Sequence, residues 1–160
     1  MSAKQAKTNA VRILENAKIP FETETYEVDE SDLSGEHIAN TLGQEVGRVF
    51  KTLVMHGDKT GFLVCCVPVA MTVNLKSVAV ISGNKSVEMI HVKELLPLTG
   101  YVRGGCSPVG MKKKFPTFFH SSALDWDRIY LSGGRRGLQI IVAPADIIKL
   151  CGAQVGEIAY

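Results

Sequence analysis

The segment Val49-Phe-Lys-Thr-Leu-Val-Met55 is followed after a short interval by Phe62-Leu-Val-Cys-Cys-Val-Pro-Val69. Both segments are apolar and rich in β-branched residues, as buried strands are. The six residues between them, His56-Gly-Asp-Lys-Thr-Gly61, are rich in turn formers. The sequence therefore predicts a buried β-hairpin.

Further elements are expected on both sides of this hairpin. Helical spacing of apolar residues, together with capping and stop signals, predicts helices at 4–18, 34–43, 74–83, 91–96 and 144–150. Shorter runs of β-branched, aromatic and apolar residues predict strands at 21–28, 87–89, 117–120, 128–132 and 138–143. Helices and strands alternate irregularly and include hairpins, so we expect an α+β domain built on a mixed sheet. The length of 160 residues fits one domain, residues 1–160.

Composition indicates an ordinary globular protein. Hydrophobic residues make up 46% and charged residues 21% of the chain, far from the composition of disorder. The longest apolar stretch, residues 61–73, is shorter than the about 20 residues that a membrane-spanning helix needs. The N-terminal residues contain no apolar signal core. We expect a cytoplasmic protein that does not insert into a membrane.

The cysteines and histidines suggest neither a metal nor a cofactor. The four cysteines form no Cys-x-x-Cys pair and have no histidine at zinc-finger spacing. The four histidines share no motif with a nucleophile or a carboxylate, which disfavours a Ser-His-Asp hydrolase, although triads formed in space escape sequence motifs. The loop Gly105-Cys-Ser-Pro-Val-Gly-Met-Lys112 superficially resembles a phosphate loop, but Met111 stands where the lysine belongs.

Charge is distributed unevenly, although the net charge is only +2. Residues 21–45 hold eight acidic side chains and no Lys or Arg, whereas residues 101–136 hold seven basic side chains against two acidic ones. The basic segment is interpreted either as a surface that binds a polyanion or as a solvated loop.

Two features could support chemistry. Lys51 is a charge inside an apolar strand, where its stem either extends to the surface or carries a fixed positive charge for a phosphate or an ester. The pair Gly104-Gly105 either forms a plain tight turn or lets backbone N–H groups approach a ligand closely enough to stabilise an oxyanion.

At these residues the chain resembles the YbaK/EbsC family of bacterial Cys-tRNA(Pro) deacylases, relatives of the editing domain inserted in prolyl-tRNA synthetases. The matching segments occur in order from about residue 13 to the C-terminus. They are Ile19-Pro-Phe, Tyr26, Phe50-Lys-Thr-Leu-Val, Asn74-Leu-Lys, Lys85-Ser-Val-Glu-Met, Thr99-Gly-Tyr-Val-Arg-Gly-Gly-Cys-Ser-Pro-Val-Gly and Ile129-Tyr-Leu-Ser-Gly-Gly-Arg-Arg-Gly-Leu.

The resemblance implies a mixed, partly closed β-sheet flanked by helices, with a small pocket for the amino acid esterified to the tRNA 3′ adenosine. It implies catalytic roles for Lys51, which would hold the 3′ end near the ester, and for Gly104 and Gly105, which would line the reacting carbonyl. The substrate-binding residues it implies are Tyr26, Phe50, Thr52, Ser107, Pro108 and Ser132. The tRNA phosphates would be bound by Lys112, Lys113, Lys114, Arg135 and Arg136.

The resemblance also implies a reaction without a protein base, a cofactor or a metal. The thiol of a cysteinyl ester would attack its own carbonyl, releasing cysteine from Cys-tRNA(Pro), and also from Cys-tRNA(Cys), by hydrolysis or through a cyclic thiolactone. Two alternatives stay open: an alanyl-tRNA(Pro) hydrolase that activates a water, and a tRNA-binding module without turnover. The expected partners are aminoacyl-tRNA, chiefly tRNA(Pro), and prolyl-tRNA synthetase.

Two positions depart from the family pattern. Ser34 stands where members often carry a bulky aromatic residue, which would widen the pocket. Cys106 lies in the loop that contains Gly104 and Gly105, which we call the glycine loop. An aliphatic residue is usual at this position in the family, and we interpret Cys106 as structural.

Overall fold

The central hairpin forms as expected. The computed structural model describes residues 7–160. Strands β2 (Phe50–Gly57) and β3 (Gly61–Pro68) pair antiparallel around a turn at residues 58–60. The Asn84 side chain stabilises this turn, because its Oδ1 accepts hydrogen bonds from the backbone N–H groups of Lys59 and Thr60 at 2.8 and 2.9 Å.

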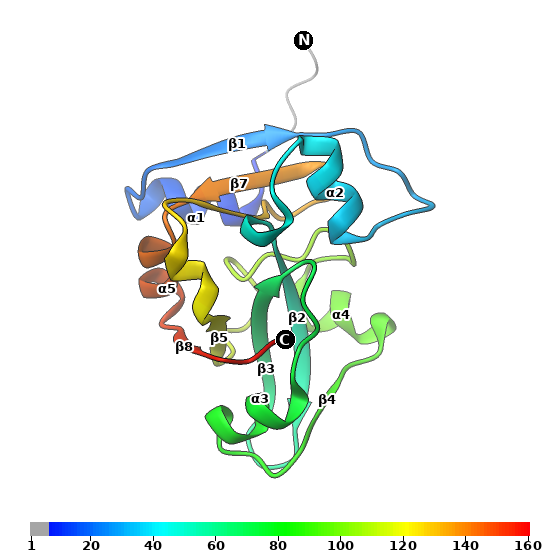
Figure 1. Ribbon diagram of the computed structural model, residues 1–160, viewed down its shortest axis with the longest axis vertical. Helices are drawn as coiled ribbons and strands as arrows, with labels where there is room; N and C mark the ends of the chain where they lie inside the picture. The colour runs from blue at the N-terminus through cyan, green and yellow to red at the C-terminus, as the bar shows by residue number, and fades with distance from the viewer. Residues whose placement is uncertain (1–6) are drawn as a thin grey trace.

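The hairpin belongs to a five-stranded mixed sheet with the order β4-β2-β3-β5-β8. Strand β4 (Val87–Met89) pairs antiparallel with β2, whereas β5 (Thr117–His120) runs parallel to both β3 and β8 (Gln154–Gly156). A second, antiparallel sheet has the order β1-β7-β6 and consists of β1 (Phe21–Thr25), β7 (Leu138–Val142) and β6 (Ile129–Ser132). In Figure 1, β2 and β3 run down the molecule while β1 and β7 cross above them.

The α+β fold is confirmed, but the strands form two sheets rather than one mixed sheet. A parallel bridge between Val49 and Tyr130 connects β2 to β6. On the edge of β2 that does not face β3, β4 pairs only with the segment from Met55 to Gly57. Between the Val49–Tyr130 bridge and the pairing with β4, β3 is therefore the only described strand that pairs with β2. The opposite edge of β2 is open there, and this open edge lies where the two sheets meet.

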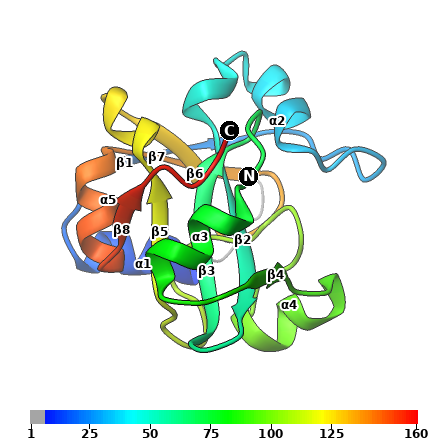
Figure 2. The ribbon, with the colours of Figure 1, turned by 60° about the horizontal axis from the view of Figure 1, so that its bottom comes forward.

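Helices surround the sheets, as Figures 1 and 2 show, and residues 7–160 contain five α-helices. Their bounds are α1 (Asn9–Asn16), α2 (Gly35–Leu42), α3 (Leu75–Ser82), α4 (Val92–Thr99) and α5 (Pro144–Cys151). Thr8, Ser34 and Asn74 cap the N-termini of the first three helices with their side chains, and glycines in left-handed conformation end α2 to α5. None of the helices in residues 7–160 is long and apolar enough to cross a membrane.

Several predicted boundaries were wrong. The first helix was expected at 4–18, but α1 begins after its Thr8 cap, and residues 4–6 of that prediction lie outside the described residues. The strand expected at 21–28 ends at Thr25, and α4 continues through Pro97 to Thr99. Strand β8 and the short 3-10 helices Val46–Arg48 and Ser121–Asp125 were not predicted.

Candidate active site

A cavity of about 370 Å³ lies along the open edge of β2. Strand β2 supplies Phe50, Lys51, Thr52 and Leu53 to its wall, β6 and β7 supply Ser132 and Gln139, and the glycine loop supplies Arg103, Gly104 and Cys106. Val49 and Val69 lie next to the hairpin strands, and the remaining wall comes from α2 and the segment before it, namely Leu33, Ser34, Gly35, Glu36 and Ile38. The cavity thus brings together segments that are far apart in the sequence.

Lys51 lies in this cavity and is half-buried. Burial lowers the pKa of its ammonium group below the ordinary value of 10.5, and the carboxylate of Glu36 opposes this shift. Glu36 is exposed at the first turn of α2 and lines the same cavity. The site therefore holds a fixed cation with a carboxylate nearby.

The glycine loop packs tightly against the turn that follows β6. A Cβ atom at Gly105 would lie 2.9 Å from backbone atoms of Arg135 and Arg136, so only glycine fits there. Gly104 has a φ of +84°, which side chains disfavour, and it faces the side chain of Arg136. The Tyr101 hydroxyl, which donates to the Val109 carbonyl at 2.6 Å, holds the other end of the loop.

Arg136 connects three segments around the cavity. Its Nε donates to the carbonyl oxygen of Arg103 at 2.8 Å, directly before Gly104. Its Nη1 forms an ion pair with Glu30 at 2.9 Å, in the acidic segment that leads into α2. The acidic segment is therefore attached to the glycine loop through one side chain.

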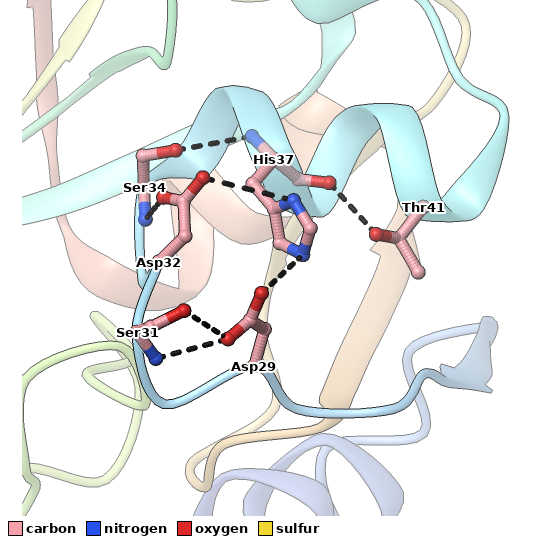
Figure 3. Close-up of polar contacts among 6 residues, drawn as sticks. All are labelled: Asp29, Ser31, Asp32, Ser34, His37 and Thr41. Carbon is pink, nitrogen blue, oxygen red and sulfur yellow. Dashed lines mark hydrogen bonds and ion pairs between the residues drawn. The ribbon is translucent and has the colours of Figure 1, made fainter.

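The acidic segment is ordered by its own hydrogen bonds, which Figure 3 shows. Asp29 Oδ1 accepts from the backbone N–H and the hydroxyl of Ser31 at 2.9 and 2.6 Å, and Asp32 Oδ1 accepts from the backbone N–H of Ser34 at 3.0 Å. Hydrogen bonds from Ser31 and Ser34 lower the pKa of Asp29 and Asp32, respectively. The His37 ring lies between both carboxylates, 4.0 Å from Asp29 and 3.7 Å from Asp32.

This ordering fixes one wall of the cavity. Ser34 Oγ accepts from the backbone N–H of His37 at 3.2 Å and so begins α2, while Ser34 itself lines the cavity. The position expected to widen the pocket is thus part of its wall. The capping interaction holds Gly35 and Glu36 in the first turn of the helix beside it.

The structure gathers some of the expected site residues and separates others. Lys51, Gly104, Phe50, Thr52 and Ser132 line the cavity. Gly105 and Ser107 are buried behind it, and Ser107 Oγ accepts a hydrogen bond from Val109 N–H at 3.2 Å. Pro108 lines a separate pocket of about 230 Å³, and Tyr26 follows β1, where its N–H donates to the Gly137 carbonyl.

The expected tRNA-binding residues also differ in their surroundings. Lys112, Lys113 and Lys114 are exposed and form no ion pair within residues 7–160. Arg135 lines an open groove of about 750 Å³ between α1 and β1, which contains neither Lys51 nor the glycine loop. Arg136 is paired with Glu30, as Arg128 is with Glu22, so the acidic and basic segments partly neutralise each other.

Cys106 lines the cavity as a neutral thiol. Its side chain is buried, and burial raises its pKa to about 12. Nucleophilic attack requires a thiolate, so this cysteine is poorly suited to it at neutral pH. Within residues 7–160, no three His, Cys, Asp or Glu side chains are grouped so that they could hold a metal ion.

Sequence reasoning missed three polar residues of the cavity, Arg103, Glu36 and Gln139. Arg103 directly precedes the glycine pair, and Gln139 is the one polar residue in the apolar strand Leu138-Gln-Ile-Ile-Val142. Both residues could therefore have been identified from the sequence. Glu36 carried none, because its approach to Lys51 depends on how α2 packs.

Comparison with known proteins defines the class. Residues 31–150 match the aminoacyl-tRNA editing domain family. The chain belongs to this family, and the matched region includes every residue that lines the cavity.

One curated relative resembles this chain over nearly its whole length. EbsC of Enterococcus faecalis (strain ATCC 700802 / V583), a proposed Cys-tRNA(Pro)/Cys-tRNA(Cys) deacylase, is 48% identical over 154 residues, which cover 96% of this chain and 94% of EbsC. The YbaK/EbsC resemblance seen in the sequence is thereby confirmed.

Two solved structures share the fold. The hypothetical protein APE2540 superposes with a TM-score of 0.86 at 20% identity, covering 95% of this chain and 99% of that one. A proposed trans-editing enzyme for prolyl tRNA synthetase gives a TM-score of 0.80 at 24% identity, covering 98% and 99%. At these identities the two structures support the fold alone.

Proposed function

We propose that this chain is a trans-editing aminoacyl-tRNA deacylase that releases cysteine from mischarged Cys-tRNA(Pro) and from Cys-tRNA(Cys). The observation that carries the proposal is the cavity at the open edge of β2, which combines Lys51 with the glycine loop in a chain 48% identical to EbsC. Such an enzyme acts in the cytoplasm, where tRNA is charged. A complex with prolyl-tRNA synthetase is part of the proposal, since a protein of the same fold is described as its trans-editing enzyme.

The cavity suits the end of a charged tRNA. Lys51 and Arg103 are the cations that line it, and neither forms an ion pair within the described part of the chain. They would bind the phosphate of the terminal nucleotide by charge, without reading its base. Gly104 leaves room for the ester carbonyl, because it presents no side chain to the cavity.

The reaction uses the substrate's own nucleophile. The cysteinyl thiol loses its proton and attacks the ester carbonyl as a thiolate. The bond to the ribose oxygen breaks, and that oxygen takes up a proton and leaves as a hydroxyl group. The product is a cyclic thiolactone, which water then opens to cysteine. The thiol and the ester already belong to one molecule, so the enzyme contributes by holding them in the conformation in which the sulfur reaches the carbonyl carbon.

This mechanism explains why a second enzyme is needed and why it is selective. A synthetase pocket separates amino acids that differ by one small group by only about 1–3 kcal/mol. Serine offers a poorer nucleophile than cysteine and alanine offers none, so chemistry provides the discrimination that binding cannot.

The test is a deacylation assay against tRNA(Pro) charged with cysteine, alanine, serine or proline, at an enzyme concentration far below that of the substrate. We expect many turnovers with the cysteinyl ester and little release of the other amino acids. A stoichiometric protection of the ester without release would instead indicate a tRNA-binding module. Comparable rates on Cys- and Ala-tRNA(Pro) would indicate a hydrolase that activates water.

A further inference from the structure

One buried polar side chain in the cavity is not explained by the packing of the fold. Gln139 lies in β7 between Leu138 and Ile140, and only 3% of its surface is exposed. Its amide oxygen is buried and has no hydrogen-bond partner in residues 7–160. Leaving a buried acceptor unpaired is unfavourable, so a strand that is otherwise apolar would be more stable with leucine at this position.

Gln139 lies on the face of β7 that points to the cavity. The adjacent residues Leu138 and Ile140 belong to the large core cluster, whereas Ile141 contacts the smaller cluster under α2. Side chains alternate along a strand, so Gln139 shares the face of Ile141. Its partner on β6 is Ser132, which also lines the cavity, and its partner on β1 is Glu24.

The polar residues that line the cavity differ in how exposed they are. Glu36 and Arg103 are exposed, Lys51 is half-buried, and Gln139 is the most buried of them. The cations Lys51 and Arg103 suit the anionic nucleotide of the substrate, and the more buried Gln139 suits the amino acid. At that end an aminoacyl ester carries an α-ammonium group, which is a donor with three N–H bonds and requires an acceptor.

We propose that Gln139 recognises the α-ammonium group of the aminoacyl ester, with its amide oxygen accepting the hydrogen bond. The inference rests on the proposed function, whose substrate it orients. In the structure the amide oxygen is buried. A half-turn of the last side-chain torsion exchanges the oxygen and nitrogen of the amide at almost unchanged shape, which exposes the oxygen to the cavity and moves the NH2 group into the buried position. The contact positions the carbonyl, which is bonded to the carbon that carries the ammonium group, and limits the reach of the thiol, which is attached to the same carbon through one methylene.

The test combines a change in the enzyme with a change in the substrate. Gln139→Leu is measured on cysteinyl-tRNA(Pro) and on 3-mercaptopropionyl-tRNA(Pro), which keeps the thiol and lacks the amine. We expect kcat/KM on the cysteinyl ester to fall by about 10- to 100-fold, the size expected for a charged hydrogen bond, and kcat/KM on the other ester to stay within about twofold. Gln154→Leu, the same change at an exposed position of β8, should alter neither rate.

A binding experiment makes the outcome independent of turnover. The 3′-amido adenosine analogues of the two esters are titrated against wild type and Gln139→Leu, and Kd is followed by NMR chemical shifts. We expect wild type to prefer the amine-bearing analogue and the variant to lose that preference. Equal losses on both esters, or a preference that survives in Gln139→Leu, would overturn the role of Gln139. An inactive wild type that still prefers the amine-bearing analogue would refute the deacylase function and leave the Gln139 contact standing.

Discussion

Arg136 Nη1 lies 2.9 Å from Glu30 Oε2, and this ion pair joins the turn behind the glycine loop to the acidic segment that leads into α2. The same guanidinium also donates to the carbonyl oxygen of Arg103. Two walls of the cavity therefore depend on one side chain. Arg136 acts here as a positioning residue, and its binding of tRNA phosphates would compete with these contacts.

Arg136→Ala should lower kcat/KM for Cys-tRNA(Pro) by about tenfold, because the glycine loop and the segment before α2 lose a charged hydrogen bond that links them. Glu30→Gln should cost less, since Glu30 is exposed and surface ion pairs contribute about 0–1 kcal/mol. The matched control is Arg128→Ala, which breaks the 2.6 Å pair with Glu22 away from the cavity. A loss of activity in the control equal to that in Arg136→Ala would contradict a specific positioning role.

Lys51→Met should keep the fold and lower kcat/KM by about 10- to 100-fold, because a charged contact to the substrate is lost while the stem of the side chain is preserved. Circular dichroism and thermal unfolding check the fold, and single-turnover deacylation checks the activity. Wild-type rates in Lys51→Met would exclude Lys51 from the site.

The pH dependence of the reaction provides a separate test of Lys51. Burial lowers the pKa of its ammonium group, so the charged form is lost at lower pH than for a free lysine. Enzymatic deacylation, corrected for spontaneous ester loss, should therefore decline on the alkaline side. Glu36→Gln removes the contribution that raises this pKa and should move the decline to lower pH, whereas Lys51→Arg should abolish it. An alkaline limb that is identical in all three proteins would assign the titration to another group.

The sequence predicted the parts of this site that depend on local pattern. Lys51 is a charge in an apolar strand, and Gly104 is part of a Gly-Gly pair in a loop, so the sequence alone indicates both residues. Gln139 interrupts its strand in the same way and could have been selected by the same rule. The proximity of Glu36 to Lys51 and the pairing of Arg136 with Glu30 could not be predicted, because both depend on long-range packing of α2 and the segment before it.

The same distinction applies to the fold. Helix caps at Ser34 and Asn74 were visible as short signals and fixed the starts of α2 and α3. Strand β8 is only three residues long and pairs in parallel with β5, so neither alternation nor a hairpin turn indicates it. The two sheets are separate because the segment at the start of β2 meets β6 only at the Val49–Tyr130 bridge, which no local pattern encodes.

Charge reversal of Lys112, Lys113 and Lys114 to glutamate should weaken tRNA binding and flatten its salt dependence. Each lost phosphate contact lowers the slope of log K against log salt by about 0.7–0.9, so the change should be about 2–3 if all three lysines bind phosphates. Filter binding across a salt series measures this slope. The same reversal of three other exposed lysines, Lys59, Lys76 and Lys93, should change it less, and equal changes in both triple variants would indicate nonspecific attraction.

The last prediction separates attack by the substrate thiol from catalysis by a protein group. The cavity contains one thiol, Cys106, whose pKa burial raises to about 12, and one carboxylate, Glu36. If the cysteinyl ester supplies its own nucleophile, neither group is required, so Cys106→Ala and Glu36→Gln should both keep a large preference for Cys- over Ala-tRNA(Pro) at neutral pH. Cys106→Ala should lower the free energy of unfolding by about 1 kcal/mol, the usual cost of a single core change. Rapid quench with a thiol-specific reagent should trap the thiolactone before water opens it. A loss of activity specific to Cys106→Ala would assign the nucleophile to the protein, whereas a loss in Glu36→Gln at a pH where Lys51 stays charged would assign a general base and favour hydrolysis by an activated water.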